Sequence, residues 1–352
     1  MEALLIAMAC ALLFCSVKDD WWGEYQEGIR HYSDEDLNKM FPEKTRPMFF
    51  KHPPFQCPDM TPSATVPSSE FVKAADIKVI TALGDSMTTA VGANATTVLE
   101  IPIEFRHVSW IGGYGTFQDA ITLAIIKLFN PNLLGASPGQ TMHGKEADIS
   151  ETGFNLAVTG HNTDLPGQTR ELIDTLRRHE GLNFDEDWKL LTILIGMNDI
   201  CDYCKDKALY SVDNFIHYIT VSLEMLMNEF QVPRMIVNVV QILRMDFLRE
   251  VEKPTPGCRL QRRLEKLLHS DRFFRKDFAV VLQPFPKHAE PPRLPNGKID
   301  MTFFTHDCFH ITIKGHEELA KGLWNNMFQP EGEKMIVTSF TEPLKLICPP
   351  EV

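Results

Sequence analysis

The sequence predicts an α/β protein with three layers, in which a mostly parallel, five-stranded sheet is covered by helices on both faces. From Ile77 onward, short apolar runs rich in β-branched residues alternate with longer amphipathic stretches. The runs are almost continuously apolar, as in strands that are buried on both faces. The chain has 352 residues, of which 44% are hydrophobic and 23% charged. This composition suits a large core and excludes a disordered chain, a collagen or a coiled coil.

Five apolar runs are expected to form the strands. They are Ile77–Leu83, Phe154–Val158, Leu190–Ile195, Met235–Val240 and Phe278–Leu282. Four amphipathic stretches, each with one apolar face, are expected to form helices. They are Thr116–Phe129, Leu165–Arg178 (after a predicted Asp164 cap), Val212–Phe230 and Thr312–Phe328. Because strands and helices alternate, the strands should be parallel, with the chemistry at their carboxyl ends.

The two ends of the chain differ from this region in composition and residue pattern. Residues 1–16 contain an apolar run that is too short to span a bilayer and is followed by small residues, which is typical of a signal peptide. Residues 17–73, rich in proline, aromatic and charged side chains, should form an extended N-terminal segment. The α/β domain would cover residues 74–330, and residues 331–352 would form a C-terminal tail without a hydrophobic anchor. We therefore expect a secreted protein without a transmembrane anchor.

The net charge of −12 restricts the partners of the protein. Nucleic acid is not expected, because phosphate binding needs clustered Lys and Arg. Electrostatic docking on anionic lipid is also disfavoured.

Six cysteines follow the predicted signal peptide, and an even number in a secreted chain favours disulfide bonds. They are Cys57, Cys201, Cys204, Cys258, Cys308 and Cys348. Cys57 and Cys348 bracket the main body, which favours a bond between them. Cys201 and Cys204 form a Cys-x-x-Cys pair, for which a structural disulfide is favoured over a redox role. Asn94 begins the only Asn-x-Ser/Thr sequon and is a candidate for glycosylation.

Polar residues suited to acyl transfer lie at the predicted strand ends. Gly84-Asp85-Ser86 follows the first run, so that Ser86 is either a nucleophile or part of a helix cap. Gly160 and Asn198 follow the next two runs. Their N–H groups could stabilise an oxygen that becomes negative during the reaction, although both residue types are also common in turns.

A histidine and a carboxylate precede the last predicted helix. Asp307 and His310 are close enough in sequence to pair, as a base and its orienting group must. Asp199, beside Asn198, is a competing carboxylate. The set His306, Asp307, His310 and His316 could instead hold zinc. Its spacing matches no His-Glu-x-x-His helix, so no metal or cofactor is expected. Nucleophile, base, carboxylate and oxyanion donors together predict ester hydrolysis.

These blocks, taken in order, resemble the GDSL (SGNH) hydrolase superfamily. They are Gly84-Asp85-Ser86, Gly160, Gly196-Met197-Asn198-Asp199 and Asp307-Cys308-Phe309-His310, with Met87 in place of the usual Leu. Further segments are similar to the animal phospholipase B1 group, namely Ser109–Thr116, Lys127–Ser137, Gly196–Cys204 and Met301–Met327. The resemblance implies the flavodoxin-like SGNH hydrolase fold for residues 74–330.

The resemblance also implies a role for each site residue. Ser86 would be the nucleophile and His310 the base, oriented by Asp307 or, as second choice, by Asp199. The oxyanion hole would consist of the backbone N–H groups of Ser86 and Gly160 and the side chain of Asn198.

A phospholipase B-like enzyme hydrolyses acyl esters of glycerophospholipids and lysophospholipids through an acyl-serine intermediate. The expected partners are therefore a phospholipid or other lipid ester and, transiently, a lipid surface. Two alternatives stay open: a short-chain or carbohydrate esterase on the same fold, and a non-catalytic secreted lipid-binding protein.

Overall fold

The structure is a computed structural model. It describes residues 55–113, 122–162, 164–203, 205–242, 264, 267–268, 271–307 and 309–350. The predicted signal peptide, residues 17–54 of the predicted N-terminal segment, Cys204, Cys258 and Cys308 lie outside these residues.

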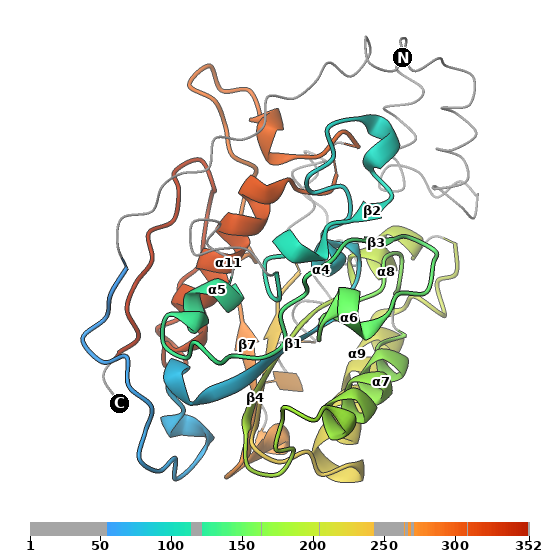
Figure 1. Cartoon of the computed structure of the whole chain (residues 1–352). Coiled ribbons are helices and arrows are strands. Elements are labelled where there is room, and N and C mark those ends of the chain that lie inside the picture. The colour runs from blue at the N-terminus through green and yellow to red at the C-terminus, as the bar shows by residue number, and fades with distance from the viewer. Residues whose placement is uncertain are drawn as a thin grey trace.

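A five-stranded sheet forms the centre of the molecule (Figure 1). Its strand order is β1-β4-β5-β7-β6. Its strands are β1 (Ile77–Gly84), β4 (Trp188–Leu194), β5 (Met235–Val240), β7 (Phe278–Gln283) and β6 (Phe274–Arg275). The first four are parallel, and the short edge strand β6 is antiparallel to β7. The prediction of a mostly parallel five-stranded sheet is confirmed.

The predicted strand Phe154–Val158 is not a strand, although it does lie beside β1. Leu156 and Val158 donate their N–H groups to carbonyls of β1, at 2.9 and 3.1 Å. Leu134, from a different part of the chain, also exchanges hydrogen bonds with this edge of β1. Because two segments share one edge, neither pairs over a long stretch. The fifth strand is β6 instead.

Helices cover both faces of the sheet, with α5 and α11 on one side and α7 and α9 on the other (Figure 1). Their bounds are Thr122–Lys127 (α5), Ile313–Met327 (α11), Leu165–Arg178 (α7) and Val212–Glu224 (α9), which continues as a π-helical turn over Met225–Glu229. All four lie where helices were predicted, and residues 116–121 of the first fall outside the described part. None of the helices in the described ranges combines the length and the apolar character that crossing a membrane requires.

Asp164 is the N-cap residue of α7, as predicted, but it does not cap the helix with its side chain. Its side chain accepts no hydrogen bond from the start of α7, because its backbone (φ −75°, ψ 33°) lacks the extended conformation of a capping residue. Pro166 in the first turn fits the helix start instead.

Shorter elements connect the main ones. They are the helices α4 (Ser86–Thr89), α6 (Ile149–Thr152) and α8 (Met197–Asp202), the strand pair β2 (Ile103–Glu104) and β3 (Thr141–Met142), and the 3-10 turns Ser69–Phe71, Ala74–Asp76, Val98–Glu100, Arg106–Val108, Asp271–Phe273 and Met301–Phe303.

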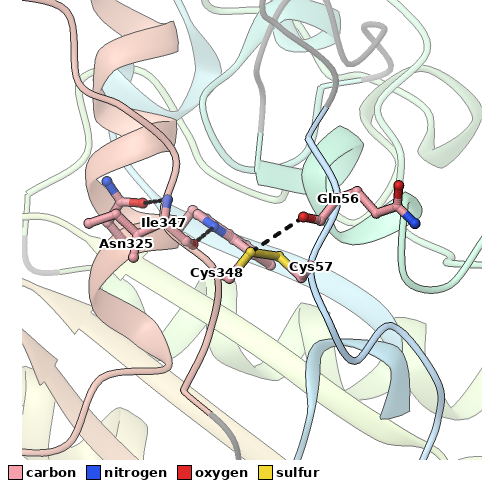
Figure 2. Close-up of a disulfide and its surroundings, with 6 residues drawn as sticks. Gln56, Cys57, Asn325, Ile347 and Cys348 are labelled. Carbon is pink, nitrogen blue, oxygen red and sulfur yellow. Dashed lines mark hydrogen bonds between the residues drawn. A yellow bond between two sulfur atoms is a disulfide. The ribbon is translucent and has the colours of Figure 1, made fainter.

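Residues 331–350 form no helix or strand and lie against α11 through side-chain hydrogen bonds. Asn325 accepts from the N–H of Ile347 at 2.9 Å, and Trp324 donates to the Ile347 carbonyl at 2.8 Å. Figure 2 shows the adjacent disulfide between Cys57 and Cys348, whose Cα atoms are 5.5 Å apart. The predicted bond between these two cysteines is confirmed.

Candidate active site

Three segments end side by side at the carboxyl edge of the sheet. Gly84, the last residue of β1, pairs with Leu194 of β4 on one side and accepts the N–H of Val158 on the other. A few residues later each segment reaches one of the predicted site residues, which are Ser86, Gly160 and Asn198.

The turn that carries Ser86 depends on a glycine and a capping aspartate. Gly84 has φ +152°, and a Cβ atom there would lie 2.2 Å from the carbonyl oxygen of Leu194. Asp85 then caps α4 by accepting the N–H of Met87 at 3.0 Å. Ser86 is the first residue of this helix and is 5% exposed.

His310 joins Ser86 to Asp307. Its Nε2 lies 2.8 Å from the Ser86 hydroxyl oxygen, and its Nδ1 lies 2.6 Å from Oδ2 of Asp307. Both ring nitrogens therefore have a partner, and neither partner is Asp199, which is buried in α8. Of the two predicted carboxylates, the structure brings Asp307 to the histidine.

The other oxygen of Asp307 is also fully engaged. Its Oδ1 accepts from the hydroxyl of Thr305 at 2.5 Å and from the N–H groups of Phe309 and His310 at 2.9 Å each. Burial alone would raise the pKa of Asp307, but the charge of His310 and these donors outweigh it and hold the pKa well below its ordinary value. The carboxylate therefore stays ionised beside the imidazole.

The loop around His310 is held by its own backbone. Thr305 donates its N–H to the His310 carbonyl at 2.8 Å, which closes the turn that contains Asp307. The ring of Phe309 packs edge-on against the imidazole, with 4.9 Å between centroids. This turn fixes the direction of the imidazole before any substrate binds.

The predicted oxyanion donors lie next to one another. Asn198 donates one N–H of its amide to the carbonyl of His161 at 2.8 Å, which ties it to the residue after Gly160. A side-chain amide has two N–H groups, so one remains for a ligand. Gly160 has φ +83°, and within the described part of the chain no acceptor takes its backbone N–H or that of Ser86.

Two further buried groups lie near the triad of Ser86, His310 and Asp307. Asp85 is 1% exposed, and burial raises its pKa to about 6, while the hydrogen bond from Met87 and the charge of His310 act in the opposite direction. Burial likewise lowers the pKa of His316 to about 3, with His310 adding to the effect, so its ring is neutral.

Cys201 is a free thiol, so the predicted disulfide between Cys201 and Cys204 is wrong. Cys201 lies in the last turn of α8, and burial, with nearby carboxylates, raises the pKa of its thiol to about 12. A thiol with so high a pKa is unreactive, which also argues against a redox role.

The zinc site considered above does not form among the described residues, where no group of three His, Cys, Asp or Glu side chains is placed to hold a metal ion. Asn94, the glycosylation candidate, lies half-buried in the turn after α4.

Sequence reasoning missed a buried polar network behind α4. Its members are Thr89, Glu104, Arg106, Thr141 and Thr159. The available signal was Glu104-Phe105-Arg106, two opposite charges within an otherwise apolar stretch.

The sequence matches a known protein family and several known proteins. A family model described as GDSL-like Lipase/Acylhydrolase matches residues 80–323. Three curated relatives are named "Phospholipase B1, membrane-associated". The mouse protein is 37% identical over 333 residues and the human protein 38% over 335, in each case 84% of this chain but only 22% and 23% of the relative. The rat protein is 35% identical over 330 residues, with 84% and 22% covered. The chain thus spans about a fifth of the length of these relatives. No solved structure gives a significant match.

Proposed function

Because the chain belongs to the family of GDSL-like lipases and acylhydrolases, and is by that membership a carboxylic ester hydrolase, we propose that it hydrolyses acyl esters of glycerophospholipids and lysophospholipids. The family and the phospholipase B1 relatives support lipid esters as substrates. The observation that carries the proposal is the hydrogen-bonded series from Asp307 through His310 to Ser86 at the carboxyl edge of the sheet.

The proposed reaction starts with attack of the Ser86 hydroxyl oxygen on the ester carbonyl. Nε2 of His310, 2.8 Å away, takes the hydroxyl proton and later gives it to the leaving alcohol. Asp307 keeps the other ring proton on Nδ1 and stabilises the imidazolium. A water molecule, activated in the same way, then hydrolyses the acyl-serine and frees the fatty acid.

The negative charge that develops on the carbonyl oxygen needs preorganised donors. We assign this role to the backbone N–H groups of Ser86 and Gly160 and to the second amide N–H of Asn198. Their position supports the assignment, because all three follow segments that end together at one edge of the sheet.

We further propose that the protein is secreted and meets its lipid through apolar contacts. The disulfide between Cys57 and Cys348 fits an oxidising compartment. The net charge of −12 gives anionic lipid no electrostatic attraction.

The deciding experiment combines labelling with a substrate panel. An organophosphonate should label Ser86 in the wild-type protein and leave Ser86→Ala unlabelled, with ester hydrolysis lost in the variant. Wild-type protein should then cleave phosphatidylcholine and lysophosphatidylcholine faster than acetylated sugars or short-chain esters. Activity that survives Ser86→Ala would refute the mechanism. A preference for acetyl esters would refute the lipid substrate, and a folded wild-type protein that is neither labelled nor active would indicate a binding protein.

A further inference from the structure

A buried ion pair lies behind the nucleophile turn and has no part in the reaction above. Glu104, at the end of β2, and Arg106 are 4% and 5% exposed, and their side chains meet at 2.8 Å. Arg106 also donates to the hydroxyl of Thr141 at 2.7 Å and to the carbonyl of Asn155 at 2.8 Å. Burying two charges costs considerable desolvation energy, which further hydrogen bonds to each charged group must offset.

The two oxygens of Glu104 have different partners. Oε2 accepts from Arg106 and, at 2.5 Å, from the hydroxyl of Thr141. Oε1 accepts from the hydroxyl of Thr159 at 2.5 Å. Burial opposes ionisation of Glu104, but Arg106 and the hydroxyl donors hold its pKa below the ordinary value. An ionised carboxylate can only accept, so the Thr159 hydrogen points at Glu104.

This fixes the direction of the next hydrogen bond. The hydroxyl oxygens of Thr159 and Thr89 are 2.7 Å apart, and either could be the donor on distance alone. Thr159 has one hydroxyl hydrogen, which Glu104 takes, so Thr89 must donate. The charge of Glu104 therefore orders a chain of two hydroxyls, from Thr89 to Thr159 to Glu104.

These two hydrogen-bonded hydroxyls connect the segments that carry the two backbone N–H groups assigned to the oxyanion hole. Thr89 is the last residue of α4, the helix that begins at Ser86. Its single hydroxyl hydrogen is shared between Thr159, the nearer acceptor at 2.7 Å, and the Ser86 carbonyl, which accepts it at 3.2 Å. Thr159 directly precedes Gly160. The hydrogen bond between the two threonines thus ties the nucleophile helix to the segment that carries the second N–H.

We propose that Glu104 is a positioning residue for ester hydrolysis. By ordering the hydroxyls of Thr89 and Thr159, it sets the spacing between the N–H groups of Ser86 and Gly160. Both must point at one oxygen in the transition state, so this spacing controls the rate of the chemical step and leaves substrate binding unchanged. The inference rests on the proposed function and deepens it.

The test removes one hydroxyl at a time. Thr159→Val keeps the shape of the side chain, and Thr159→Ser, the matched control, keeps the hydroxyl. Active sites are first titrated with an organophosphonate, so that kcat for a p-nitrophenyl ester is expressed per competent site. Thr159→Val should lower this kcat ~10- to 100-fold with KM unchanged. The same variant should bind a trifluoromethyl ketone, which is held as a tetrahedral oxyanion, more weakly by the same factor. Thr159→Ser should retain most of the wild-type kcat per site and most of the affinity for the ketone.

A second pair of variants tests Glu104 itself. If Glu104 acts through Thr159, Glu104→Gln lowers kcat per titrated site in the wild-type background and lowers it no further in Thr159→Val. A merely structural network would reduce thermal stability and the number of titratable sites, but not kcat per site or the affinity of the ketone. Wild-type kcat per site in Thr159→Val, or independent effects in the double variant, would overturn the proposal. Failure of the proposed function is seen separately, as a wild-type protein that the organophosphonate does not label.

Discussion

Replacing Asp307 by asparagine should nearly abolish ester hydrolysis while leaving the protein folded. Oδ1 of Asp307 accepts three hydrogen bonds, from Thr305, Phe309 and His310, and an amide oxygen can keep all three. The amide nitrogen must then occupy the place of Oδ2, 2.6 Å from Nδ1 of His310. Two donors cannot share this contact, so the imidazole hydrogen moves to Nε2. A protonated Nε2 facing Ser86 cannot take the hydroxyl proton.

The expected loss follows from this wrong tautomer. An equivalent change in a Ser-His-Asp triad costs about 10⁴ in kcat, which corresponds to about 5 kcal/mol of transition-state stabilisation. The assay is kcat for a p-nitrophenyl ester, with the tautomer of His310 read from its ¹⁵N chemical shifts. Asp199→Asn is the matched control, since Asp199 is an equally buried carboxylate beside the site. If Asp199→Asn caused the 10⁴-fold loss and Asp307→Asn left the rate within tenfold of wild type, the assignment of Asp307 would be wrong.

Three further predictions follow from other contacts. Asn198→Ala should lower kcat by ~10² to 10³, as for loss of one oxyanion donor; an effect on KM alone would contradict this role. The pKa of Asp85 is raised from 3.8 to about 6, so the native state holds this proton more tightly than the unfolded chain, and stability should fall as the pH rises from about 4 to 6. The free energy of unfolding of wild type should drop by about 3 kcal/mol more than that of Asp85→Asn over this range, and parallel pH curves would show that Asp85 is not responsible. Replacing Cys57 and Cys348 by serine opens a loop with a sequence separation of 291 residues and should lower the free energy of unfolding by about 6 kcal/mol in the chain-entropy account. Urea titration of both forms measures the difference, and coincident curves would refute it.

Local sequence patterns were enough to predict most of the strands and helices. Strands such as Met235–Val240 were predictable because a strand buried on both faces is a continuous apolar run. The segment Phe154–Val158 has the same pattern, yet it is not a strand, because it pairs only near the carboxyl end of β1, while Leu134 occupies the preceding positions of the same edge. That division of the edge depends on a contact between distant parts of the chain, which no local pattern contains.

Local sequence likewise predicted some residues of the candidate site and missed others. Ser86 and the pair of Asp307 and His310 were predictable, because the chemistry needs those residue types close to strand ends or to each other in sequence. The choice between Asp307 and Asp199 needed the geometry around the imidazole. The link from Glu104 to Thr159 spans 55 residues, and no local pattern around either residue predicts that contact.

The disulfide between Cys57 and Cys348 has a consequence for damaged protein. A single peptide-bond cleavage anywhere between these cysteines yields two fragments that remain covalently joined. When the cut lies between Ser86 and His310, the two fragments that carry them stay at a high effective concentration relative to each other, and their reassociation is intramolecular. Protein nicked by a protease in one exposed loop can thus keep its two halves assembled, and it would separate only after reduction.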